Sequence, residues 1–138
     1  MTIGFVVNDD AFEVGSPDFL KGVFSTVSYH LEPGGWGSKY PEIMHDLYHG
    51  KLASAKAEKA LADLHSIRQS LRAIRPVKII WDIDNPAAPA PWGDAAIPVD
   101  RDLSNCFMTS NGKNVFEVLS ICLEGLASQG GELTIEPY

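Results

Sequence analysis

Apolar side chains repeat at helical spacing along the middle of the chain, and this pattern constrains the fold more than any other feature. The stripe consists of Ala57, Ala60, Leu61, Leu64, Ile67, Leu71 and Ile74. The basic side chains Lys56, Lys59, Arg68, Arg72 and Arg75 lie off it. One face of this helix is therefore expected to be buried and the other to be solvated. Ser54 is predicted to cap the helix at its start, and Pro76 is predicted to stop it.

The segment after residue 14 carries converging signals for a second helix. Ser16 can accept a hydrogen bond from the first-turn N–H groups, Pro17 suits the first helical position, and Asp18 complements the helix dipole. The helix is predicted to run to about Glu32. Its core face is formed by Phe19, Leu20, Val23, Phe24, Val27 and Leu31. A short third helix is predicted over residues 41–49.

Short apolar and β-branched segments predict the strands. They lie at residues 2–8, 77–83, 106–110 and 132–136. In the strand at 77–83, alternation places Asp82 and Asp84 on one face. Asn114 is predicted to cap a heavily buried helix that ends near Gly130. The order of these elements predicts an α+β fold, in which a small mixed β-sheet packs against about four α-helices.

Length and composition indicate one globular domain. A chain of 138 residues can bury a core without disulfides or metals, and 45% apolar with 21% charged residues is unlike a disordered chain. The first residues lack a basic side chain before the apolar ones, and no apolar stretch is long enough for a membrane span, so a cytoplasmic protein is expected. Cys106 and Cys122 fit neither a zinc motif nor a redox pair. No cofactor is expected.

Charge is distributed unevenly along the chain. The formal net charge is −7, yet residues 51–78 hold seven of the eleven basic side chains and only two acids. This segment therefore carries +5, and the remainder carries −12. Such a balance disfavours nucleic-acid binding and favours encounter with a cationic protein surface.

Residues 81–94 (WDIDNPAAPAPWGD) concentrate acids, prolines and two tryptophans. Asp82, Asp84 and Asp94 form a candidate carboxylate cluster, which a metal-dependent hydrolase would use to bind magnesium or to activate water. Nucleophile motifs and a phosphate-binding glycine loop are absent from the sequence. The favoured interpretation is a stiff anionic surface for a protein partner, with the hydrolase as the alternative. A third possibility is an adaptor domain that binds an endogenous protein.

His45 and His49 are four residues apart on the predicted short helix, and this spacing could place two imidazoles on one face as zinc ligands. A metalloprotease helix would have glutamate directly after the first histidine, whereas this chain has Asp46. No third ligand is evident. Structural or surface histidines are therefore expected.

Several separated motifs resemble immunity protein family 70, a family of small cytoplasmic antidotes encoded beside bacterial polymorphic toxins. The motifs are GSPDFLKGVFSTVSYHLE, GGWGSKYPEIMHDLYHGKL, IIWDI, PWGD and DLSNCFMTSNGKNVFEVL, within about residues 14–126. The resemblance implies a non-enzymatic protein that binds the C-terminal domain of one cognate toxin and neutralises it by stoichiometric occlusion. It carries over no catalytic residue and does not identify the toxin.

The resemblance and the charge pattern together suggest a toxin-binding surface. Acidic side chains would raise the rate of association with a cationic toxin, and tryptophans in a proline-stiffened loop bury much area with little loss of rotamer freedom. The expected surface comprises Asp82, Asp84, Trp92, Asp94, Trp36 and Tyr40.

Overall fold

The computed structural model describes residues 1–90 and 101–138. Within these ranges the strands are β1 (Ile3–Val7), β2 (Asp10–Gly15), β3 (Lys51–Ala53) and β4 (Glu132–Pro137), and they form one sheet in the order β2-β1-β4-β3. The α-helices are α1 (Pro17–Leu31), α2 (Ala57–Leu71) and α3 (Val115–Gln129), and Glu42–Leu47 forms a π-helical segment, η1. The α+β class is confirmed, but every described strand pair is antiparallel, so the prediction of a mixed sheet was wrong.

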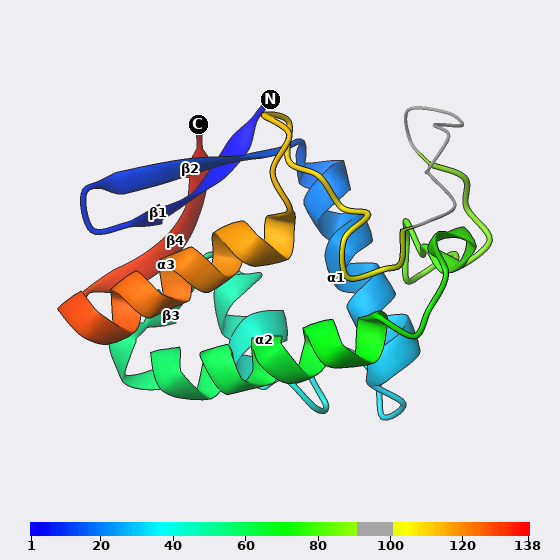
Figure 1. Cartoon of the computed structure of the whole chain (residues 1–138), viewed down its shortest axis with the longest axis horizontal. Coiled ribbons are helices and arrows are strands. Elements are labelled where there is room, and N and C mark those ends of the chain that lie inside the picture. Colours follow the sequence, from blue (N-terminus) through cyan, green and yellow to red (C-terminus); the bar gives the residue numbers. More distant parts are fainter. Residues whose placement is uncertain (91–100) are drawn as a thin grey trace.

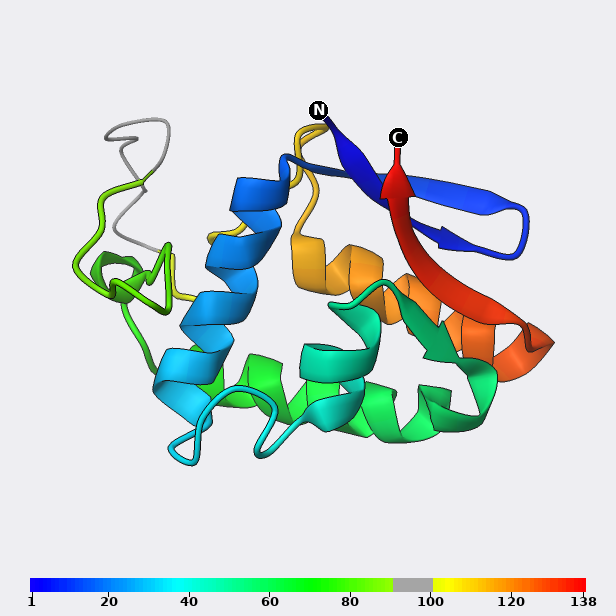
Figure 2. The same ribbon diagram turned by 180° about the vertical axis from the view of Figure 1, so that it is seen from behind.

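The elements are arranged in layers, with α3 between the sheet and α2 (Figure 1). The inward face of the sheet presents Phe5, Val14 and Leu133, which are fully buried. Because α3 is covered from two sides, its apolar residues surround more than one face, as the sequence predicted. Seen from behind, α1 runs across the ends of α2 and α3, and β4 lies between β1 and β3 (Figure 2). None of the described helices is long and apolar enough to cross a membrane.

β2 is a strand that the sequence analysis missed. Val7 pairs with Asp10, so Asn8 and Asp9 form a two-residue hairpin turn in which Asn8 adopts a φ of 55°. Asparagine tolerates this left-handed conformation better than most residues. The signal was present, because Asn8-Asp9 separates an apolar strand from a short segment that includes Phe12.

Two of the three predicted helix caps are confirmed. The Ser16 hydroxyl accepts a bond from Phe19 N at 3.1 Å, and the Asn114 side chain accepts one from Phe116 N at 2.9 Å. The prediction for Ser54 was wrong: Lys56 stands at the N-cap of α2 without a side-chain cap bond. The 3₁₀ turn η2 (Ser54–Lys56) precedes the helix and begins at the predicted cap.

The predicted strand at 77–83 does not form. The chain makes the 3₁₀ turn η3 (Pro76–Lys78) and then runs along α1, and none of the described strands pairs with it. The hydroxyl of Thr26 in α1 makes the backbone bonds that a neighbouring strand would otherwise make. It accepts a bond from Ile80 N at 3.0 Å and lies 3.1 Å from Ile80 O. A short apolar run fits a buried strand and a segment packed on a helix equally well, and periodicity does not separate them.

Two other predicted elements also take different forms. The expected strand at 106–110 is reduced to a single bridge between Met108 and Asn114. The expected short α-helix at 41–49 is the π-helical segment η1, followed by a turn that ends at Gly50 with a φ of 113°. Gly50 thus takes the left-handed role that its position after the helix indicated.

Candidate functional site

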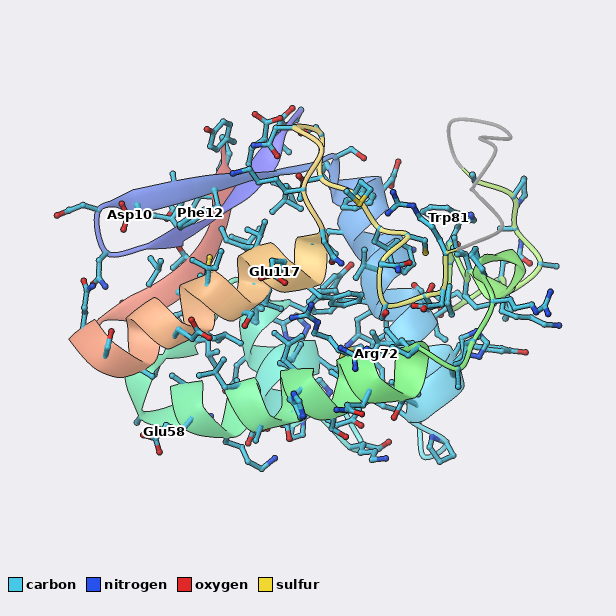
Figure 3. The ribbon with its side chains drawn as sticks, viewed as in Figure 1. Asp10, Phe12, Glu58, Arg72, Trp81 and Glu117 are labelled. Atoms are coloured by element: carbon cyan, nitrogen blue, oxygen red, sulfur yellow. The ribbon has the colours of Figure 1, made fainter. Side chains whose placement is uncertain are left out.

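The acidic turn, which we define as Asp82–Asp84, is held on the side of α1. Ser25 accepts a hydrogen bond from Ile83 N at 3.2 Å, and Lys21 forms an ion pair with Asp82. Figure 3 shows Trp81, directly before the turn, beside α1. These contacts fix the backbone at Ile83 and the side chain of Asp82, so the carboxylates are presented from a positioned segment and not from a free loop.

Trp81 packs closely against α1 at Gly22. A Cβ atom added to Gly22 would lie 2.4 Å from the Trp81 ring, which is closer than carbon atoms approach without displacement. The indole also meets Phe107 edge-to-face, with ring centroids 6.2 Å apart. The absence of a side chain at Gly22 therefore provides the space in which the Trp81 ring, directly before the turn, packs on α1.

The two carboxylates of the turn have different environments. Asp82 accepts a hydrogen bond from Asp84 N at 3.0 Å and lies 3.3 Å from Lys21 Nζ. Bonding to the Asp84 N–H, with a further contribution from Lys21, lowers the pKa of Asp82, so this side chain is ionised at neutral pH. Asp84 is exposed. The pair therefore displays negative charge, and the strand geometry that would have aligned both acids for catalysis does not exist here.

The other residues of the predicted toxin-binding surface pack inside the protein or lie outside the described residues. Tyr40 is only 3% exposed, so its ring belongs to the core and cannot contact a partner directly. Trp36 is half-buried, donates its indole N–H to Met44 O at 2.7 Å and packs on Phe24. Both aromatics act as packing residues in this arrangement. Trp92 and Asp94 fall within residues 91–100, outside the described residues.

Tyr29 is an exposed aromatic residue that the sequence analysis did not select. It lies one helical turn beyond Ser25 on α1 and is 52% exposed. Tyrosine is enriched at the energetic centres of protein interfaces, because its ring buries area and its hydroxyl can hydrogen-bond. The signal was available, since Tyr29 is an aromatic residue outside the apolar stripe of its helix.

The residues considered as metal ligands do not gather into a site within residues 1–90 and 101–138. No group of three or more histidine, cysteine, aspartate or glutamate side chains lies close enough there to hold a metal ion. The rings of His45 and His49 stack with centroids 6.2 Å apart, and His45 Nε2 lies 3.1 Å from Trp36 O. One imidazole nitrogen of His45 is therefore engaged with the backbone.

Of the two cysteines, Cys122 is buried and Cys106 is partly buried. Burial raises the pKa values of Cys106 and Cys122 to about 12, so both remain protonated at neutral pH. Because the thiolate is the reactive form, we expect both cysteines to react slowly with a disulfide reagent at pH 8 and rapidly once urea unfolds the chain. Rapid labelling of two thiols in the native protein would contradict this expectation.

Comparison with known proteins gives a family but no individual relative. No curated protein and no solved structure matches the chain. The family model described as immunity protein 70 matches residues 5–135, nearly the whole sequence, and extends beyond the motifs at 14–126 that first indicated the resemblance. The chain belongs to the immunity protein 70 family.

Proposed function

We propose that this immunity protein neutralises one cognate bacterial polymorphic toxin in the cytoplasm by forming a stoichiometric complex with the toxin's C-terminal domain. The acidic turn is the central contact, with Tyr29 beside it. The supporting observation is that Asp82–Asp84 is anionic and is held by side chains of α1. Trp92 and Asp94 remain in the proposal on sequence grounds alone.

Occlusion requires a complementary surface and no chemical step by the immunity protein. A positioned turn loses little conformational freedom when it is covered, so more of the contact energy appears as affinity. Negative charge on the turn accelerates encounter with a cationic toxin domain and disfavours partners of the wrong charge. The proposed function therefore depends on shape and charge at one side of α1.

Co-expression with the toxin domain encoded beside the gene tests this function. We expect cells producing that domain to grow when the immunity protein is present, and the two chains to co-purify in a fixed ratio. Continued toxicity, or recovery of growth through turnover of a substrate by the immunity protein, would contradict stoichiometric neutralisation.

Removing the charges of the acidic turn should slow toxin association. In the double variant Asp82→Asn and Asp84→Asn, the asparagine at position 82 can still accept the backbone bond of the turn, so the main loss is charge. We expect the association rate constant to fall roughly three- to tenfold at low ionic strength and the difference to shrink in high salt. Stopped-flow or surface-based kinetics measures both.

A charge-matched control separates local contact from net charge. Asp10→Asn with Glu58→Gln also removes two negative charges, and both residues are exposed at the end of the molecule away from Trp81 (Figure 3). We expect this control to retain most of the association rate. Equal slowing by the two double variants would show that overall charge, and not the acidic turn, guides the toxin.

A further inference from the structure

A groove that contains two arginines, in contrast to the acidic turn, lies between α2 and α3. It encloses about 260 Å³, and its lining includes the apolar side chains Leu61 and Leu64 with the polar groups of His65, Arg68 and Ser120. Arg72 also lines it. Figure 3 places Arg72 near the end of α2 and Glu117 near the beginning of α3. A volume of this size holds a side chain, and the lining combines apolar walls with hydrogen-bond donors.

The arginines of this groove retain unused donors. Arg68 Nη2 lies 3.1 Å from a Glu117 carboxylate oxygen, yet its Nε is buried and has no hydrogen-bond acceptor among the described residues. Each guanidinium has five N–H donors, and an unpaired buried donor is costly. Arg72 is exposed and forms no ion pair in the described part of the chain. A carboxylate entering the groove would meet both guanidinium groups.

The sign of the charge here differs from that of the rest of the protein. α2 lies within the segment that carries +5, whereas the remaining residues carry −12. Among the residues that line the groove, Glu124 is the acid that opposes the basic groups. Glu117 pairs with Arg68. Arg72 is therefore the arginine of the groove that has no acidic partner in the described part of the chain, and it is the group that favours an anion there.

We propose that this α2–α3 groove receives an aspartate or glutamate side chain of the bound toxin domain. The methylene groups of that side chain would contact Leu61 and Leu64, and its carboxylate would bind Arg68 and Arg72. The identity of the partner rests on the proposed function, but the carboxylate preference of the groove does not. Two sites of opposite charge would fix the orientation of the toxin and exclude domains that match only one of them.

The groove can be tested without the toxin by following the arginine Nε–H signals in proton–nitrogen correlation spectra. The probe is N-acetylglutamate methylamide, and the neutral control is N-acetylglutamine methylamide at matched ionic strength. We expect saturable shifts of the Arg68 and Arg72 signals with the acidic probe alone. Equal shifts with both probes, or tighter saturation by inorganic phosphate than by the acidic probe, would overturn the carboxylate assignment.

Three single variants then test the groove in the toxin complex. Arg72→Gln should weaken toxin affinity roughly tenfold, as expected for loss of a hydrogen bond to a charged group. Glu124→Gln removes the opposing acid and should strengthen affinity. Arg75→Gln makes the same charge change as Arg72→Gln at an exposed residue outside the groove, and should have little effect. Equal weakening by both arginine variants would overturn the proposal.

The outcomes separate this proposal from the proposed function. Saturable binding of the acidic probe without any toxin complex would support the groove as a carboxylate site and overturn toxin neutralisation. A toxin complex that is insensitive to Arg72→Gln and Glu124→Gln, with no probe binding, would overturn the groove and leave neutralisation standing.

Discussion

Replacing Gly22 with alanine should destabilise the protein by about 1–3 kcal/mol, although alanine is the better helix former. The new Cβ would lie 2.4 Å from the Trp81 ring, so either the indole or α1 must move. Movement of Trp81 also strains the bonds on either side of it, from Ile80 N to Thr26 and from Ile83 N to Ser25. Urea unfolding monitored by circular dichroism measures the free-energy change.

Gly125 provides the matched control for this substitution. It lies inside α3, and a Cβ atom added there meets nothing within 4 Å. Gly125→Ala should therefore stabilise the protein by about 0.5–1 kcal/mol, the ordinary gain for alanine in a helix. Changes of the same sign at Gly22 and Gly125 would show that the close approach to Trp81 is not a constraint.

A double-variant cycle would assign the effect to the Gly22–Trp81 contact. Trp81→Leu removes most of the ring that the new Cβ would meet, so Gly22→Ala should become neutral or stabilising in that background. A penalty of unchanged size would place the strain elsewhere. In the toxin complex, Gly22→Ala alone should also slow association, because it displaces the acidic turn that follows Trp81.

The elements that could be predicted from the sequence are those with local causes. Ser16 and Asn114 cap their helices through bonds that span two or three residues. The periodic apolar residues that follow each cap indicate which part of the helix is buried. The prediction of a strand at 77–83 was wrong because this segment bonds to Thr26, more than fifty residues earlier in the chain. A hydrogen bond to a helix hydroxyl produces no periodic pattern in the sequence. Long-range side-chain bonds to the backbone decide such segments.

The candidate site was also predictable only where local sequence properties determine it. Asp82 and Asp84 were selected by composition, and composition does reflect surface charge. Tyr40 was misplaced, because an aromatic residue next to glycine-rich sequence fits a core position and an exposed anchor equally well. The α2–α3 groove could not be predicted from the sequence, because it depends on how two helices that are far apart in the chain pack together.

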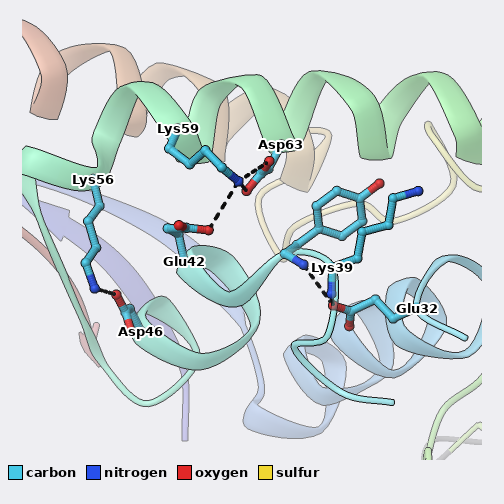
Figure 4. A network of polar contacts seen from close by, with 8 residues as sticks. Glu32, Lys39, Glu42, Asp46, Lys56, Lys59 and Asp63 are labelled. Atoms are coloured by element: carbon cyan, nitrogen blue, oxygen red, sulfur yellow. Dashed lines mark hydrogen bonds and ion pairs between the residues drawn. The ribbon is translucent and has the colours of Figure 1, made fainter. Parts of the chain in front are cut away.

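The carboxylate of Glu32 organises the loop that follows α1, and its loss should have the second large effect. Glu32 is 3% exposed and accepts backbone bonds from Gly37, Lys39 and Tyr40, each at 3.0 Å. Figure 4 shows this carboxylate beside Lys39. An ionised carboxylate is an acceptor at both oxygens, so a single side chain satisfies three N–H groups that would otherwise be unpaired.

Glu32→Gln keeps the shape of the side chain and removes this capacity. Whichever way the amide is oriented, its NH₂ group faces at least one backbone N–H, and donor then opposes donor. We expect a loss of about 2–4 kcal/mol, since bonds to a charged acceptor disappear and buried donors are left unpaired. Chemical denaturation measures the loss, and amide hydrogen exchange should accelerate at Gly37, Lys39 and Tyr40.

The control for Glu32→Gln is Glu124→Gln, which makes the same chemical change at an exposed position of α3. Its effect on stability should stay within about 0.5 kcal/mol, as is usual for surface substitutions. Because Tyr40 and the π-helical segment η1 follow directly after the loop, loosening the loop should also loosen the packing of η1 against β3 and α2. If Glu32→Gln and Glu124→Gln change the free energy of unfolding by the same amount, the loop must be held by its apolar contacts, and the three backbone bonds contribute little.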